Sequence, residues 1–224
     1  MQNLFKGNVI YFYYAFIVFL LASSLVLVFV PYGNEVLFTN KFANTMLDKT
    51  AILLTQLGLG LVMGFLALIF IFIRYYYAIA TVISLFFTGF FTGVFKKLIF
   101  NGMPRPTGYF NKTDFYHLIP NFNYHELNTF PSGHAMTAIA VFLLLAVAFN
   151  GKRWSVFLAV FGITVALTRI YLLQHFLFDV FVGSILGVLC SLLGLYFAGL
   201  ILKKDKNMMG RSLLDESFFK RNKS

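Results

Sequence analysis

The chain has 224 residues, of which 59% are hydrophobic and only 12% are charged, and its mean hydropathy is +0.80. This composition excludes an ordinary soluble domain and predicts one all-α, polytopic membrane domain. The formal net charge of +10 does not indicate nucleic-acid binding, because the positive residues lie mainly between apolar runs and near the C-terminus. The single cysteine, Cys190, excludes an intrachain disulfide and a cysteine-based metal site.

The apolar runs predict six transmembrane helices, separated by polar segments or charged residues. These spans cover residues 9–30, 51–73, 75–95, 132–149, 155–168 and about 174–202. Residues 31–50 are expected to form a polar loop. Residues 96–130 form a longer one, and loops of this length are uncommon unless they have a function. We therefore divide the chain into a membrane domain, residues 1–202, and a basic cytoplasmic tail, residues 203–224.

Charge predicts how these spans are oriented. Six spans place both termini on one side, and the positive-inside rule makes that side cytoplasmic. That side then carries the basic tail together with Lys6, Arg74, Lys152 and Arg153. Loops 31–50, 96–130 and 170–173 share the outer face, where Lys96, Lys97, Arg105 and Lys112 break the charge bias. Positive charge on this side predicts an anionic ligand.

Residues 168–179 place polar groups where an apolar chain should avoid them, because their flanks, 156–167 and 180–202, contain no charged residue. A charge at the centre of a membrane helix costs about 3 kcal/mol or more, so such groups are usually paired and functional. His175 and Asp179 are four residues apart, which predicts one helix face. A carboxylate there can hold one imidazole nitrogen and leave the other basic. Arg169 adds a cation suited to phosphate. The alternative for this stretch alone is a buried ion pair that joins two helices.

Two further segments are predicted to meet residues 168–179 at the outer face. The first is Lys97 with Pro104-Arg105-Pro106, and the second is Pro131-Ser132-Gly133-His134 at the start of the fourth helix. Ser132 is a favoured N-cap, Gly133 allows a ligand close to the backbone, and free amides at a helix N-terminus bind anions. His134 would stand beside them as a proton donor. The loop residues His117, His125 and Glu126 are interpreted as solvated rather than functional.

Together these segments resemble the three-part signature of the type 2 phosphatidic acid phosphatase superfamily, which includes membrane lipid phosphatases and soluble vanadium haloperoxidases. Five residues separate Arg169 from His175, and three separate His175 from Asp179. The first motif departs from the family pattern, because seven residues rather than six separate Lys97 from Arg105, and Lys96 is the alternative lysine. Thr168 stands where the family usually has serine.

The resemblance implies a role for each matching residue. His175 would be the nucleophile that forms a phosphohistidine, Asp179 would orient it, and His134 would protonate the leaving alkoxide. The phosphate would be held by Lys97, Arg105, Ser132, Gly133 and Arg169. No metal and no other cofactor is implied.

The expected function is hydrolysis of a lipid phosphate at the outer leaflet of a bacterial inner membrane. Candidate substrates are phosphatidylglycerophosphate, undecaprenyl diphosphate, phosphatidate and the phosphates of lipid A. The alternatives are phosphoryl transfer to another lipid at the same site, and a non-enzymatic membrane scaffold or transporter. The expected partners are the lipid substrate and the bilayer. The sequence does not indicate the oligomeric state.

Overall fold

The computed structural model describes residues 7–203 and 210–213, and this part of the chain is helical, with one isolated β-bridge between Pro104 and Leu127. Most of the predicted basic tail falls outside the described residues. The helices that build the body are α1 (Ile10–Phe29), α3 (Thr45–Thr55), α4 (Gly60–Ile73), α5 (Tyr75–Val94), α7 (Gly133–Phe149), α8 (Lys152–Tyr171) and α9 (Leu177–Leu202). The expected all-α class is confirmed.

Four helices in the described part of the chain are long and apolar enough to cross a membrane: Ile10–Phe29, Tyr75–Ile99, Lys152–Tyr171 and Leu177–Leu202. A fifth crossing is possible if Thr45–Gly58 and Gly60–Ile73 count as one span, since they are bent by 57° at the break between them. The remaining apolar helix, α7, has 17 residues and is shorter than these four. Length and composition therefore support four or five of the six predicted spans.

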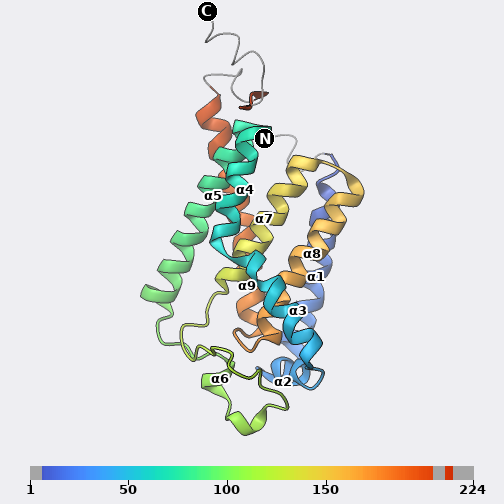
Figure 1. Ribbon diagram of the computed structural model, residues 1–224, viewed down its shortest axis with the longest axis vertical. Coiled ribbons are helices and arrows are strands. Elements are labelled where there is room, and N and C mark those ends of the chain that lie inside the picture. Colours follow the sequence, from blue (N-terminus) through green and yellow to red (C-terminus); the bar gives the residue numbers. More distant parts are fainter. Residues whose placement is uncertain (1–6, 204–209, 214–224) are drawn as a thin grey trace, which may run out of the picture.

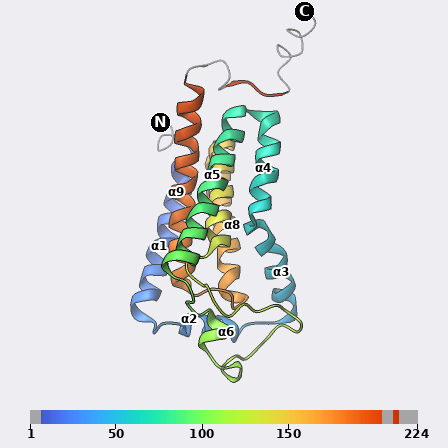
Figure 2. The same ribbon diagram turned by 90° about the vertical axis from the view of Figure 1, so that its left-hand side faces the viewer.

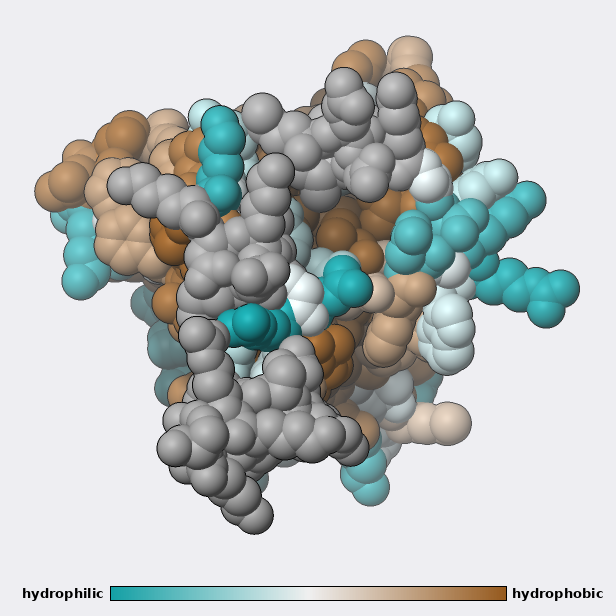
Figure 3. Space-filling model, turned by 90° about the horizontal axis from the view of Figure 1, so that it is seen from above, coloured by the Kyte–Doolittle hydropathy of each residue, from teal (hydrophilic) through white to brown (hydrophobic). Residues whose placement is uncertain are grey.

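The helices run roughly side by side (Figures 1 and 2). The turns between α4 and α5 and between α7 and α8 lie at one end, where hydrophilic residues appear in several places (Figure 3). The opposite end carries the short helices α2 (Asn34–Asn40) and α6 (Pro106–Tyr109) and the turn between α8 and α9. The three loops predicted to share one face therefore lie at the same end of the bundle.

The segment interpreted as a polar loop, residues 31–50, is largely helical, which corrects the prediction. It contains α2 and the first half of α3. Asn44 begins α3 as its N-cap, because its side-chain oxygen accepts hydrogen bonds from the amides of Met46 and Leu47 at 3.1 and 3.0 Å. The second span therefore starts at Thr45 and breaks at the 3₁₀ turn η1 (Gln56–Gly58).

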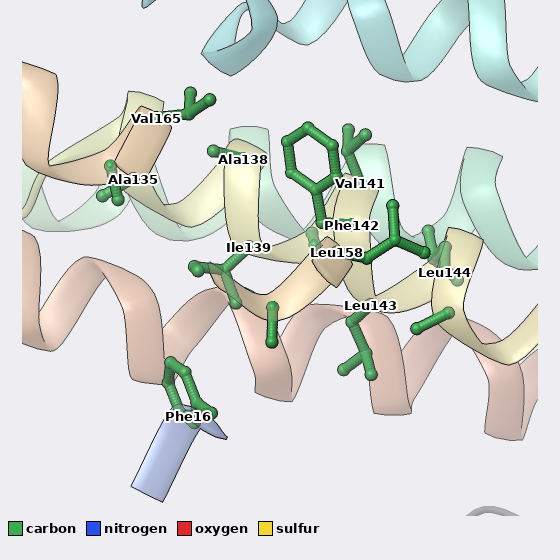
Figure 4. Close-up of a cluster of buried hydrophobic side chains, with 14 of the residues drawn as sticks. Phe16, Ala135, Ala138, Ile139, Val141, Phe142, Leu143, Leu144, Leu158 and Val165 are labelled. Atoms are coloured by element: carbon green, nitrogen blue, oxygen red, sulfur yellow. The ribbon is translucent and has the colours of Figure 1, made fainter. Parts of the chain in front are cut away.

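Helix α7 lies at the centre of the apolar core. Most of its side chains are buried, and it packs mainly against α8, through residues such as Leu158 and Val165, and against α9, while Phe16 of α1 belongs to the same apolar cluster (Figure 4). Helices α5 and α9 also approach closely, because Gly194 has no side chain: a Cβ there would lie 2.1 Å from Ser84 Oγ. Tight packing of these helices provides a rigid support for the end that carries α2, α6 and the turn between α8 and α9.

The long loop folds back on itself before it enters α7. The amide of Arg105 donates to the carbonyl of Glu126 at 2.7 Å, and the amide of Thr129 donates to the carbonyl of Met103 at 3.2 Å. Gly108 fits against this pairing, since a Cβ would lie 2.5 Å from the Glu126 carbonyl oxygen. The loop thus brings Arg105 and Thr129 to the start of α7.

Candidate active site

His175 lies in the tight turn between α8 and α9, not in the helix that its spacing to Asp179 predicted. The sixth helix begins at Leu177 rather than near Gln174. Leu173 has φ of +56°, a left-handed conformation that is uncommon for a residue with a side chain. The turn then folds back, because the amides of Gln174 and His175 both donate to the carbonyl of Arg169, at 3.0 and 3.2 Å. His175 is 1% exposed.

Asp179 nevertheless reaches His175 as expected. Its Oδ2 lies 3.4 Å from His175 Nδ1, and both side chains are buried. The same oxygen accepts hydrogen bonds from the hydroxyl of Thr129 and from the amide of Phe176, the latter at 2.8 Å. Thr129 Oγ1 also lies 3.3 Å from His175 Nδ1. These contacts direct Nδ1 towards the carboxylate, so that Nε2 is the nitrogen left for chemistry.

Arg169 is the most deeply placed cation of the cluster. It lies in the last turn of α8 and is 6% exposed. Its Nη1 donates to Thr55 Oγ1 of α3 at 2.9 Å, whereas its buried Nε has no hydrogen-bond partner among the described residues. Buried donors are normally paired, so the unpaired Nε is available to an anionic ligand.

The start of α7 forms the second part of the site. Ser132 is the N-cap, as predicted, and its Oγ accepts the amide hydrogen of Ala135 at 3.3 Å. The amide of Ser132 donates to the carbonyl of Asp179 at 3.0 Å, which joins this helix start to α9. Gly133 packs against α5, where a Cβ would lie 3.2 Å from the methyl group of Thr92. His134 follows in the first turn and is half-buried.

Arg105 is held by the long loop and by the turn between α8 and α9. Its Nε donates to the carbonyl of Leu127 at 2.9 Å, and its Nη1 donates to Gln174 Oε1 at 2.7 Å. Gln174 is 1% exposed and donates in turn to the carbonyl of Asn123 at 3.3 Å. Much of the hydrogen-bonding capacity of Arg105 is therefore used to join residues 123–128 to the turn beside His175.

The two candidate lysines lie in the π-helical turn η2 (Phe95–Ile99), where α5 ends. Lys96 is half-buried and interacts electrostatically with Arg105, Arg169 and Asp179. Lys97 is exposed. A π turn holds more residues than an α turn and often marks a functional site. The turn thus directs Lys96 rather than Lys97 towards the cluster.

The electrostatics of the cluster favour a neutral His175 and an anionic ligand. Burial, together with the charges of Lys96, Arg105 and Arg169, lowers the pKa of His175 well below its usual range. Partial burial and the same three cations also lower the pKa of His125. His125, interpreted from sequence as a solvated loop residue, is exposed but lies within the field of this cluster.

The structure therefore brings together His134, His175, Asp179, Arg105, Arg169 and the start of α7, and it adds residues that the motifs did not contain. Thr129, Gln174 and Thr55 contact Asp179, Arg105 and Arg169, respectively. Only Thr129 had a sequence signal, its position just before the Pro131-Ser132-Gly133-His134 motif. Among residues 7–203 and 210–213, no group of three or more His, Cys, Asp or Glu side chains is placed to hold a metal ion.

Two solved structures are similar in fold. One is LpxE of Aquifex aeolicus, with a TM-score of 0.62 and 21% identity, covering 75% of this chain and 96% of that one. The other is a transmembrane PAP2 type phosphatidylglycerolphosphate phosphatase of Bacillus subtilis, with a TM-score of 0.58 and 22% identity, covering 85% and 96%. The search of curated proteins found no match.

The family model of the PAP2 superfamily matches residues 76–201, more than half of the chain. The matched segment contains the long loop, the start of α7 and the turn with His175. With its apolar helices, the protein is an integral membrane protein and a member of the PAP2 superfamily.

Proposed function

We propose that this protein hydrolyses a lipid phosphate through a phosphohistidine formed on His175, without a metal ion. The observation that carries the proposal is the buried contact between His175 Nδ1 and Asp179 Oδ2 within a ring of cations. The carboxylate holds one imidazole nitrogen, so the lone pair of Nε2 is free to attack phosphorus. The low pKa of His175 keeps that nitrogen unprotonated at neutral pH.

In the first step, Nε2 forms a bond to phosphorus and the bond from phosphorus to the lipid oxygen breaks. His134 gives its proton to the departing alkoxide. In the second step, His134 takes a proton from water, whose oxygen attacks phosphorus and breaks the phosphorus–nitrogen bond. Inorganic phosphate leaves, and both histidines return to their first state.

Phosphoryl transfer depends mainly on positioning and on stabilising charge at the phosphoryl oxygens. Arg169, with its unpaired Nε, and Lys96 are the side chains that we assign to those oxygens, together with the free amides at the start of α7. Arg105 contributes charge from beside the catalytic turn. Lys97 is the alternative for the lysine, and its exposed position is the reason that we prefer Lys96.

A lipid substrate fits the position of the site. The cluster lies at one end of the apolar helices, where a hydrocarbon tail can remain in the bilayer while its phosphate reaches His175. We propose six membrane passes, with this end at the outer face of a bacterial inner membrane. A cysteine placed at Lys112 should then react with an impermeant maleimide added outside intact cells. Labelling only after cell lysis would contradict this orientation.

Phosphate release from purified protein tests the proposed function. The panel contains phosphatidylglycerophosphate, undecaprenyl diphosphate, phosphatidate and lipid A phosphates, each with excess chelator, and His175→Ala serves as the control. We expect release from at least one lipid, unchanged by chelator and lost in the variant. Transfer of phosphate to an added lipid alcohol in place of release would favour the phosphotransferase. Activity that depends on a metal ion, or that survives in His175→Ala, would contradict the mechanism.

A further inference from the structure

A helix outside the three motifs contacts two of the predicted active-site residues. The second span, α3 with η1, reaches Arg169 through Thr55 and His134 through Gly58. We infer that this broken span is a positioning element of the phosphatase site, in which Thr55 orients Arg169 and Gly58 sets the place of His134. The inference rests on the proposed function. Both residues lie outside residues 76–201, the segment that the family model matches.

Thr55 restricts the side chain of Arg169, which would otherwise have many rotamers. Its Oγ1 accepts a hydrogen bond from Arg169 Nη1 at 2.9 Å, and the two residues are 5% and 6% exposed. Fixing an arginine costs side-chain entropy, and a preformed contact reduces the part of that cost that falls on the transition state. Because Thr55 engages Nη1, the unpaired Nε remains for the phosphoryl oxygens.

Helix α3 is itself anchored close to Arg169. Asp48, one to two turns before Thr55, accepts a hydrogen bond from the hydroxyl of Tyr171 at 2.7 Å. Its other carboxylate oxygen lies 2.8 Å from His117 Nε2 in the long loop. Asp48 is buried, and Tyr171 is two residues beyond Arg169 on α8. Helix α3 thus connects the end of α8 with the loop that carries Arg105.

The break after α3 allows the second contact. Gly58 is buried in η1, and a Cβ at this position would lie 2.9 Å from the carbonyl oxygen of His134 and 3.1 Å from its Cβ. Only a residue without a side chain fits so close to another backbone. The 57° bend between α3 and α4 occurs at this same point, so the irregular turn lies where the active site needs close packing.

The two contacts predict different kinetic effects, because Arg169 acts on the phosphoryl group and His134 acts on the leaving group. Thr55→Val keeps the shape and removes the hydroxyl. We expect kcat to fall by about 10- to 100-fold, the range for a lost hydrogen bond to a charged group, with little change in KM. The loss should be similar for an alkyl lipid phosphate and for an aryl phosphate, and Thr55→Ser should restore most of the activity.

Thr50→Val is the matched control on the same helix. Thr50 is exposed, and its hydroxyl donates to the carbonyl of Met46 in its own helix. We expect this variant to retain wild-type kinetics. Thermal unfolding of all three threonine variants shows that the comparison concerns folded protein. Equal activity of Thr55→Val and Thr50→Val would overturn the inference for Thr55.

Gly58→Ala should displace His134 and so impair protonation of the leaving group. We expect a loss of 10-fold or more with an alkyl phosphate and a smaller loss with an aryl phosphate, whose phenolate leaves without a proton. An equal loss with both substrates would show general distortion and overturn the role of Gly58. Wild-type turnover and its absence in His175→Ala, measured in parallel, test the proposed function separately.

Discussion

Removal of the Thr129 hydroxyl gives the sharpest test of how the nucleophile is held. Thr129 is fully buried, donates to Asp179 Oδ2 and lies 3.3 Å from His175 Nδ1. In Thr129→Val the side chain keeps its shape, but the carboxylate loses one donor and the imidazole loses a lateral contact. A hydrogen bond to a charged group contributes about 1.5–3 kcal/mol.

If the whole free energy of this hydrogen bond is lost in the transition state, kcat/KM falls by about 10- to 150-fold. The loss should appear mainly in kcat, because Thr129 contacts the residue that orients the nucleophile and not the substrate. The assay is phosphate release from the best lipid of the panel in detergent micelles. Thr129→Ser should retain most of the activity, since it keeps the hydroxyl.

Thr88→Val is the control, because Thr88 is also a buried threonine and its hydroxyl donates to the carbonyl of Leu85 within α5. This variant should match the wild type in activity and show any general cost of the substitution in thermal unfolding. A Thr129→Val enzyme within twofold of Thr88→Val would refute the view that this hydroxyl supports the His175–Asp179 pair.

Further predictions concern the cations, the catalytic turn and pH. Lys96→Met should lower kcat/KM by about 100-fold, the usual cost of losing one donor that stabilises the transition state. This loss should be at least tenfold greater than the loss in Lys97→Met. The reverse order would show that Lys97 binds the phosphate. Gln174→Leu removes the 2.7 Å contact between Arg105 Nη1 and the side chain of residue 174, so we expect a raised KM in steady-state kinetics. Gln174→Glu keeps an acceptor for Arg105, but its negative charge opposes phosphate, so its KM should stay above the wild-type value. Burial and the nearby cations lower the pKa of His175, so the imidazole should stay neutral as the pH falls through about 6.5, the ordinary value, and protonate only below it. ¹⁵N NMR of histidine-labelled protein, assigned with His175→Gln, measures this, and a midpoint at or above the ordinary value would contradict it.

The location of the candidate site could be predicted because charge is rare in this chain. Arg169 and Asp179 stand out against uncharged flanks, and the Pro131-Ser132-Gly133-His134 motif marks a helix start that the structure confirms at Gly133. The apolar runs likewise predicted the helices, since their length and composition alone determine where the chain can enter a membrane.

Local backbone geometry explains the errors. The positive φ of Leu173 ends α8 and keeps His175 out of α9, and leucine gives no sequence signal for this conformation. The π turn at the end of α5 changes the direction of successive side chains, so spacing from Arg105 alone leaves both Lys96 and Lys97 as candidates, and the half-buried Lys96 is the one that we prefer. Short helices with mixed polarity, such as α2, resemble loops in sequence because they show too few turns for a periodic pattern.

Two partners of the motif residues, Thr55 and Gln174, could not be predicted from the sequence. Thr55 lies in an apolar span, 114 residues before Arg169. Gln174 looked like an ordinary polar residue beside His175. Their roles follow from tertiary contacts that only the folded chain brings together.

Trapping the phosphoenzyme is the measurement that decides whether His175 is the nucleophile. Protein mixed with ³²P-labelled lipid phosphate and quenched within milliseconds should carry label that is stable to base and labile to acid, as expected for a phosphorus–nitrogen bond. The label should be absent in His175→Ala. With a labelled aryl phosphate, whose phenolate leaves without a proton, it should accumulate when His134→Ala slows attack by water. Label that survives in His175→Ala, or turnover by wild-type protein in which no acid-labile label can be trapped, would contradict a phosphohistidine at this position.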